Sequence, residues 1–465
     1  MQKSKFNIHV TYENEPPAGP LGGFELYTIA IGTVLGAGII TMLPAAIGQM
    51  GMKAGVWFAI MCIVGFIYVL PYLICASALR FGGGATSVAG ALGSPFLGGL
   101  YGLGYCLTPF ALGVYGTSLA NYVTALFPDW NIKIIAVAVL TVFLVMNILG
   151  VRWMARMQKY MFIVLAAGLL LFIGFGIPHV NWSAFSVSNP EWSVGTPALQ
   201  FSGAMILFSA CSYYWPIIAQ GRNAANPRRD IPRAGLFTFI TIVLLFLAVG
   251  IVATGILPYA ECTTTLVNVA KYIFPDWLFK LWMFCVPVML ITTTVNGLFT
   301  AFEAPISQTA IDGWLPKCLA KKNRFGAHWI LLTVFWAMGS LPILLGFSVS
   351  AIIANNNLMS FLFECILFIT MMNLPKRFPK AWREAKWHIP DWLFRTCCII
   401  GMGIKITAMW STLINITITN IVIVAIMVLC IVCWAIYRAK TNKVEVMVSC
   451  WDPTGEVKFN TCDGQ

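Results

Sequence analysis

Three glycines, at positions 32, 36 and 38, interrupt a long apolar run in the segment GTVLGAGIIT, residues 32 to 41. Each costs about 1 kcal/mol relative to alanine inside a helix, so the helix is expected to unwind there. Unwound backbone leaves N–H groups free, and the positive ends of half-helix dipoles add to their attraction for a carboxylate. The alternative is that the glycines only let a neighbouring helix pack closely. The residues predicted to form this carboxylate site are Thr33, Gly36, Ala37, Gly38 and Ile39.

A second polar cluster, FSACSYYWP at residues 208 to 216, lies within another apolar run and ends in a proline. Because proline cannot donate a helical hydrogen bond, this run is also expected to unwind. The small residues would then offer free carbonyls to a ligand amine, and the Phe208 ring would stack over the ligand. The residues predicted to form this part of the site are Phe208, Ser209, Ala210, Cys211 and Ser212, with Tyr213 and Trp215 as gating candidates.

A few charged and hydroxyl side chains lie inside later apolar runs. An ionised Glu303 would be costly there unless paired or hydrated, and a desolvated carboxyl group binds a proton more readily. We predict that Glu303 carries a coupling proton; a counter-charge for a cationic ligand and a structural pair are the alternatives. Thr293 and Thr294 are candidates for a sodium site, unless they only bond their own helix. Glu364 and Lys405 are expected to pair structurally.

The composition requires these residues to be held by membrane-spanning helices. The chain has 59% hydrophobic and 10% charged residues and a mean hydropathy of +0.81, whereas soluble domains carry about a quarter charged residues. Stretches of about 20 apolar residues match the thickness of a bilayer core. The twelve predicted spans are 24–49, 54–79, 97–126, 131–149, 158–177, 197–220, 234–257, 279–311, 328–346, 349–373, 393–413 and 415–437.

The basic residues follow the topology of these spans. One side carries almost all of the 29 lysines and arginines, and the loops of the other side carry only Lys53, Lys133, Lys271 and Lys280. Because cytoplasmic loops retain basic residues, both termini are predicted to be cytoplasmic, in a multi-pass plasma-membrane protein. The net charge of +12 is therefore explained without a nucleic-acid partner.

Cysteine and histidine usage argues against a metal, a cofactor or an enzyme. The fourteen cysteines are scattered mostly within spans, without a disulfide framework or a zinc-binding spacing. The four histidines fall in loops or at membrane edges, so a buried histidine relay is not expected. Without a cluster of histidines and carboxylates, a membrane enzyme is disfavoured.

The two interrupted runs occupy matching positions if residues 24–177 and 197–373 are two five-helix halves. Paired interruptions of this kind indicate a transporter site near the membrane midplane. Helices eleven and twelve, within 393–437, then lie outside the repeat and outside the transport core. Residues 1–23 and 438–465 are expected to be cytoplasmic terminal segments.

Four motifs in register resemble the amino acid–polyamine–organocation superfamily of transporters. IGTVLGAGII looks like its first-helix signature, and FGGGATSVAGALGSPFLGGLYG at 81–102 is similar to its stretch between helices two and three. NAANPRRDIPRA at 223–234 matches its signature after helix six, and DGWLP at 312–316 matches the end of its helix eight. The resemblance implies an all-α inverted repeat of the leucine-transporter type that moves amino acids or amines by alternating access.

Departures from the family pattern leave the substrate and the coupling open. Ile40 replaces the family's aromatic residue, SYYW replaces the acidic residue of helix six, and helix five lacks the buried lysine of some proton-coupled members. The aromatic residues near the site favour a neutral or apolar amino acid, moved by proton coupling or by exchange. An exchanger of polyamines or other amines and a major-facilitator-type sugar or drug facilitator are the alternatives. The loop FPDWNIK lacks cysteine, so no covalent heavy-chain partner is expected.

Overall fold

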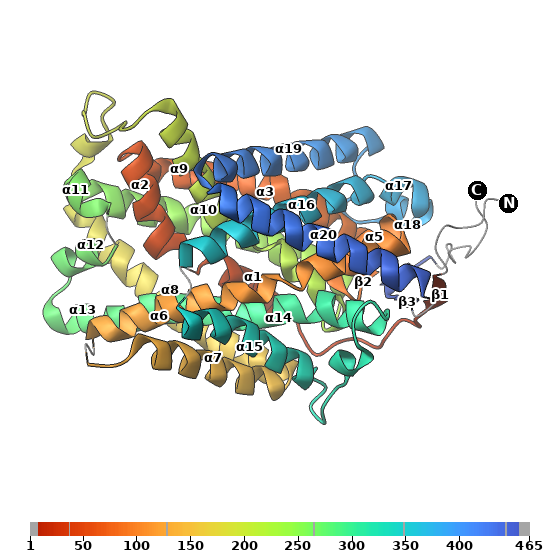
Figure 1. Cartoon of the computed structure of the whole chain (residues 1–465). Helices are drawn as coiled ribbons and strands as arrows, with labels where there is room; N and C mark the ends of the chain where they lie inside the picture. Colours follow the sequence, from red (N-terminus) through yellow and green to blue (C-terminus); the bar gives the residue numbers. More distant parts are fainter. Residues whose placement is uncertain are drawn as a thin grey trace.

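The computed structural model describes residues 8–36, 38–126, 129–263, 266–346, 349–441 and 444–454. Within these residues the chain is mostly helical, and its long helices run side by side as one bundle (Figure 1). Eight helical segments of the described chain are long and apolar enough to cross a membrane: 54–78, 95–124, 151–179, 197–222, 227–255, 276–311, 391–413 and 418–440. Four shorter apolar helices accompany them, at 23–34, 132–148, 329–345 and 357–371. The chain is therefore a multi-pass membrane protein, whereas the count of twelve crossings and the inverted repeat stay predictions.

The first apolar run is broken where its glycines lie. Helix α1 (Gly23–Val34) ends just before Gly36, and the chain resumes as the π-helical turn η1 (Gly38–Met42) and helix α2 (Leu43–Met50). Ala37 lies outside the described residues. A Cβ added at Gly36 would overlap the Thr294 hydroxyl, so glycine also permits close packing against a neighbouring helix. The helix break and the close packing therefore both occur at this segment, and carboxylate binding there stays a prediction.

The sixth predicted span is also broken, but later than expected. Helix α9 (Pro197–Ser212) stays helical throughout the FSACS stretch, and a 3₁₀ segment η5 (Trp215–Arg222) follows it. The expectation that residues 208 to 212 are unwound is therefore corrected: the break lies at Tyr213 and Tyr214. Proline at position 216 cannot donate to the Ser212 carbonyl, which instead accepts from the Tyr214 N–H at 3.0 Å.

The remaining helices surround these two broken segments. Helix α3 (Ala54–Ala78) packs along α10 (Pro227–Gly255), where a Cβ added at Gly55 would meet the Gly250 carbonyl oxygen at 2.5 Å. Small residues of this kind let membrane helices approach closely. The other elements on the amino-terminal side are α4 (Gly84–Leu92), α5 (Pro95–Tyr105), η2 (Thr108–Phe110), α6 (Ala111–Leu126), α7 (Ile132–Ile148), α8 (Val151–Gly176), η3 (Ile177–His179) and η4 (Trp182–Phe185).

The second half of the chain contains one long helix that is interrupted by a π-helical turn. This is the eighth predicted span, built from α13 (Asp276–Met283), η6 (Phe284–Val288) and α14 (Met289–Ile311). Pro287 within η6 accounts for the irregularity. The other elements are α11 (Tyr259–Cys262), α12 (Leu266–Ile273), η7 (Lys317–Ala320), α15 (Trp329–Leu345), α16 (Val349–Met371), α17 (Leu374–Arg377), α18 (Pro379–Glu384), α19 (Asp391–Asn415) and α20 (Ile418–Lys440).

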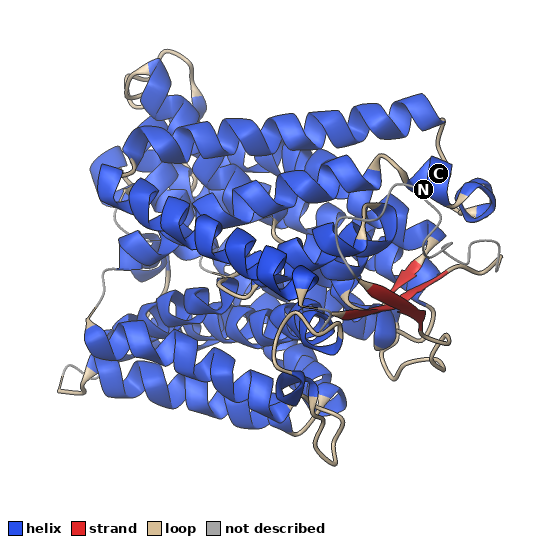
Figure 2. Cartoon of the chain, turned by 45° about the vertical axis from the view of Figure 1, so that its right-hand side comes forward, coloured by secondary structure: helices blue, strands red, loops and turns tan. Residues whose placement is uncertain are grey.

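Short strands join the two ends of the chain at one end of the bundle. Strand β1 (His9–Tyr12) pairs in parallel with β3 (Glu445–Val448), and β2 (Arg80–Phe81) pairs antiparallel with β4 (Cys450–Trp451). These strands appear in red in Figure 2, beside the ends of the long helices. We call this the terminal-strand end. The sequence patterns did not predict these strands.

Candidate functional site

A cavity of about 400 Å³ lies among the broken helices. This volume falls within the range of small-molecule sites in proteins, about 300 to 1,000 Å³. Its described lining comes from η1, α5, η2, α6, α9, α14, α16 and α19, together with Tyr213. Most of the wall is apolar or aromatic. The cavity can therefore hold a small molecule with a substantial apolar part.

Four of the predicted site residues line this cavity. They are Phe208, Ser209, Ser212 and Tyr213, at the end of α9 and in its break. Ala210 and Cys211 are buried and are not among the lining residues, and the Cys211 Sγ lies 3.1 Å from the Cys62 Sγ on α3. The Cys211 thiol is directed at α3.

Thr33, Gly36 and Ile39 are not among the described residues that line the cavity. Met42 is the described residue of the first span that lines the cavity. Thr33 donates its hydroxyl to the Ala30 carbonyl at 2.7 Å, Ile39 is fully buried, and Gly36 lies against Thr294. The carboxylate site at the break stays a prediction.

Aromatic rings form a continuous layer beside the cavity. The buried Trp215 ring stacks on Tyr72 with 5.1 Å between ring centroids and meets Tyr213 at 6.2 Å. Tyr105, which lines the cavity, meets Trp215 at 6.4 Å and Phe302 at 5.9 Å in edge-to-face geometry. Aromatic pairs in these arrangements are stabilising, so the layer is a firm wall. Trp215 belongs to this aromatic layer and is not among the described residues that line the cavity.

Thr293 and Thr294 both direct their hydroxyls at backbone carbonyls. Thr293 donates to Leu290 at 2.9 Å, and Thr294 Oγ1 lies 3.0 Å from the Leu290 oxygen and 3.1 Å from the Gly32 oxygen. Thr294 therefore ties α14 to the last turns of α1. Both threonines bond their own helix, as in the alternative prediction, and Thr294 also bonds α1. The sodium site stays a prediction.

Buried amide side chains extend this connection to two more helices. Gln158 on α8 donates to the Thr28 carbonyl at 3.3 Å and accepts from Asn296 on α14 at 2.7 Å. Asn147 on α7 donates to Asn296 at 3.2 Å. Because buried polar groups need partners, this network fixes α1, α7, α8 and α14 relative to one another. Sequence reasoning missed it, although amides inside apolar runs are a visible signal.

Glu303 is paired with a histidine from the next connection. The His328 Nδ1 lies 2.8 Å from the Glu303 Oε1, and the His328 backbone N–H donates to the same oxygen at 3.2 Å. His328 is 9% exposed. The sequence patterns did not predict this contact between Glu303 and His328, which lies at the start of α15. Glu303 is not among the described residues that line the cavity.

Glu364 and Lys405 pair as predicted, with 2.8 Å between Oε2 and Nζ. Their place in the fold differs from the expectation. Lys405, Met409 and Thr412 of α19 line the cavity, although the span that carries them was expected to lie outside the transport core. This is a correction: α19 packs against α16 and α3 and so reaches the cavity wall.

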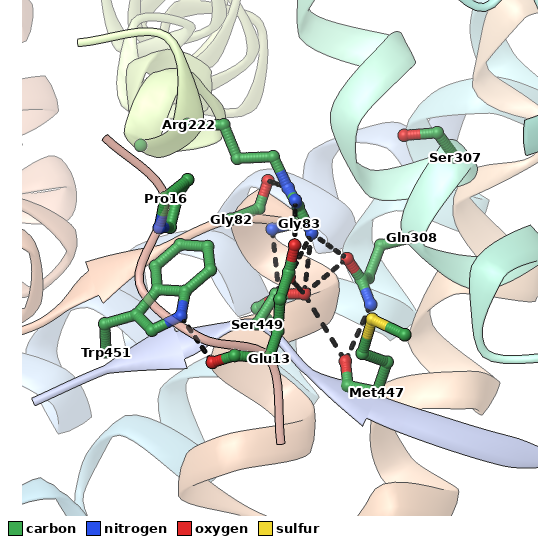
Figure 3. Close-up of polar contacts among 12 residues, drawn as sticks. Glu13, Pro16, Gly82, Gly83, Arg222, Ser307, Gln308, Met447, Ser449 and Trp451 are labelled. Atoms are coloured by element: carbon green, nitrogen blue, oxygen red, sulfur yellow. Dashed lines mark hydrogen bonds and ion pairs between the residues drawn. The ribbon is translucent and has the colours of Figure 1, made fainter. Parts of the chain in front are cut away.

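A second polar cluster lies at the terminal-strand end (Figure 3). Arg222, at the end of η5, binds Glu13 through both of its terminal nitrogens. The Ser449 Oγ lies 2.8 Å from both the Glu13 Oε2 and the Gln308 Oε1. The Trp451 indole N–H donates to the Glu13 carbonyl at 2.8 Å. We call these five residues the terminal clasp, because they join both ends of the chain to η5 and α14.

The segment NAANPRRDIPRA, residues 223 to 234, also contacts the amino-terminal part of the chain. The Leu21 N–H donates to the Asn223 carbonyl at 2.9 Å, and the Ala225 N–H donates to the Leu21 carbonyl at 2.8 Å. Arg229 and Asp230 of this segment bond each other at 2.8 Å.

A second arginine near the clasp, Arg80, also connects the amino-terminal segment to η5. Its buried side chain places Nη1 3.3 Å from the Glu15 Oε1 and donates from Nε to the Gly221 carbonyl at 2.8 Å.

Comparisons with known proteins agree with this architecture. A sequence model of the family described as Amino acid permease matches residues 21–450. The chain belongs to the amino acid permease family. Because the match spans all the described helices that could cross the membrane, the broken helices and the cavity belong to one permease unit.

Relatives within this family carry different transport names. A branched-chain amino acid permease of Lactococcus lactis is 24% identical over 79% of this chain and 84% of its own length. A methylthioribose transporter of Bacillus subtilis is 24% identical over 85% of this chain and 88% of its own. A branched-chain amino acid permease of Bacillus subtilis is 23% identical, over 52% of this chain and just over half, 56%, of that relative.

Proposed function

We propose that this permease is a secondary active transporter that moves amino acids across the plasma membrane by alternating access. Family membership supports amino acid transport, and two relatives are named for branched-chain amino acids. The observation that carries the proposal is the cavity, because it lies directly at the break of α9. A broken helix beside a cavity is the arrangement that transporters use to bind substrate.

The wall of the cavity favours a neutral or apolar amino acid. Phe208, Leu298, Phe302 and Phe361 are lining residues that suit an aliphatic or aromatic side chain. The substrate carboxylate is placed at the break around Gly36 and Gly38, and its amine beside the end of α9.

A polyamine or other cationic amine fits this cavity less well. Among the described lining residues, Lys405 is the one with a formal charge, and that charge is positive. A second cation in the cavity would be repelled by it. The amine exchanger is therefore the weaker alternative.

The orientation of the protein in the membrane and the coupling of transport belong to the same proposal. Both termini are placed in the cytoplasm, because basic residues concentrate on their side of the membrane. Coupling is assigned to a proton at Glu303, with His328 as its hydrogen-bonded partner. Exchange without a coupling ion is the alternative mechanism.

Uptake into liposomes tests the proposal. Purified protein is reconstituted and offered a panel of labelled amino acids, together with a labelled polyamine, at two external pH values. We expect saturable uptake of neutral amino acids that is faster with an inward proton gradient. Uptake of the polyamine alone would reject the substrate class, and uptake insensitive to pH would support exchange.

A further inference from the structure

The described lining of the cavity includes one side chain with a formal charge, that of Lys405. Lys405 Nζ is 2.8 Å from Glu364 Oε2, and the Lys405 ammonium also lies 5.8 Å from the centre of the Tyr68 ring. Lys405 belongs to the described cavity lining, whereas Glu364 does not. The Lys405 side chain is 20% exposed, whereas the Glu364 side chain is only 3% exposed. The pair is neutral as a whole, yet it turns its positive end toward the cavity.

Glu364 has partners other than Lys405. Tyr68 donates its hydroxyl to the Glu364 Oε2, and Ser360 donates its hydroxyl to the Oε1. A buried carboxylate held by two hydroxyl donors keeps much of its stabilisation if a third partner turns away. Lys405 can therefore share its ammonium with a second anion.

The ammonium has the donors to do this. A lysine carries three N–H donors, and one ion pair with Glu364 engages at most part of that capacity. The neighbouring lining residues on α19 are Ala408, Met409 and Thr412. Thr412 donates its own hydroxyl to the Ala408 carbonyl at 3.2 Å. The described lining from this helix therefore presents no carboxylate to compete with a ligand for the ammonium.

We propose that Lys405 is a specificity residue that binds an anionic group on the substrate side chain, so that the cavity also accepts acidic amino acids. This inference rests on the proposed transport of amino acids and adds a substrate class to it. The α-carboxylate stays at the glycine-rich break, and the side-chain carboxylate binds Lys405. Glu364 then acts as a positioning residue that lowers the affinity for the anion by competing for the same ammonium.

Two substitutions should act in opposite directions. Lys405→Met removes the charge and keeps an unbranched chain, so glutamate affinity should fall by about tenfold or more relative to the affinity for a neutral amino acid. Glu364→Gln keeps the shape of Glu364 and leaves the ammonium uncompensated, so the same ratio should rise severalfold in favour of glutamate. Lys405→Arg keeps the charge and should retain glutamate binding.

Binding of glutamate and leucine to purified protein in detergent, followed by ligand-induced thermal stabilisation, measures this ratio without requiring transport. Wild-type protein that binds leucine but not glutamate would overturn the inference and leave the proposed function standing. A purely structural ion pair would lower the melting temperature of both variants equally without changing the ratio, which would also overturn it. Glutamate binding that depends on Lys405, combined with no amino acid uptake in liposomes, would reject the transport function alone.

Discussion

Arg222 and Glu13 are joined by two parallel hydrogen bonds, of 2.6 Å from Nη1 to Oε1 and 2.7 Å from Nη2 to Oε2. Paired contacts between a guanidinium and a carboxylate are among the stronger interactions in proteins. Here they connect the amino-terminal segment to the 3₁₀ segment that follows the break of α9. Any movement of η5 away from this end of the bundle must break them.

The terminal clasp should therefore restrict opening of this end, and Glu13→Gln should loosen it. The variant loses the ionic part of the contact with Arg222 and weakens the contact with Ser449. Cys450 lies in β4, so its reactivity reports whether the strands have loosened. Burial raises the pKa of the Cys450 thiol, which makes it slow to react while the strands stay in place. We expect maleimide labelling of Cys450 to accelerate severalfold in the variant, measured by peptide mass spectrometry.

Cys318 supplies an internal control for this experiment, since its side chain is exposed. Its labelling rate should be the same in both proteins. An unchanged ratio of Cys450 to Cys318 labelling would show that the Glu13 contact does not hold the strands in place.

The stability of the fold should depend on pH through Asp312, which accepts a hydrogen bond from the Met447 N–H of β3. Burial raises the pKa of Asp312 from 3.8 to about 7, although hydrogen bonds from Gln308 and the Met447 N–H lower it in part. Protonation is thus favoured in the folded state. The contribution of Asp312 to the free energy of unfolding is therefore complete below about pH 4 and is lost as the pH rises through about 7. The free energy of unfolding should therefore be lower at pH 8 than at pH 6.

Thermal unfolding of wild type and Asp312→Asn between pH 5.5 and 8.5 measures this dependence. Asparagine resembles the neutral acid and does not titrate. The variant should therefore not show the decrease in stability that the wild type shows as the pH rises through about 7. Parallel curves for the two proteins would assign the pH dependence to another group.

The close approach of α1 and α14 requires glycine at position 36. In Gly36→Ala the new Cβ overlaps the Thr294 hydroxyl, and overpacking of this kind costs about 1 to 3 kcal/mol of stability. The double variant Gly36→Ala with Thr294→Ala should recover part of the loss, because the overlapping hydroxyl and methyl groups are removed. The melting temperature in detergent reports both effects.

Gly174 on α8 is a matched control for this substitution, because a Cβ added there meets nothing within 4 Å. Gly174→Ala should be neutral or stabilising by about 1 kcal/mol, from helix propensity. Equal destabilisation by the two alanine substitutions would refute the packing argument.

Proton coupling through Glu303 predicts the behaviour of Glu303→Gln. The variant keeps the shape and can keep a hydrogen bond with His328, but it cannot titrate. We expect uptake in liposomes to lose its acceleration by an inward proton gradient, whereas Glu384→Gln, at an exposed residue of α18, should keep it. Proton-driven uptake with an unchanged pH profile in Glu303→Gln would make Glu303 structural.

The sequence by itself determined the membrane class of the chain and the region in which its first helix breaks. Both depend on local properties: the length of apolar runs and the poor helix propensity of Gly36 and Gly38. The break of the sixth span was foreseen from its proline but placed too early, because the hydrogen bond that proline removes belongs to Ser212, four residues before it.

Only the tertiary structure decided which polar groups meet. Ser449 and Glu13 are 436 positions apart in the sequence, and nothing in the local pattern of either terminus predicts their contact. His328 reaches Glu303 because of how α15 packs beside α14, and Lys405 reaches the cavity because α19 packs against α16. Periodicity shows that a residue lies within a helix, but the rotation and neighbours of that helix depend on side-chain packing across the whole bundle.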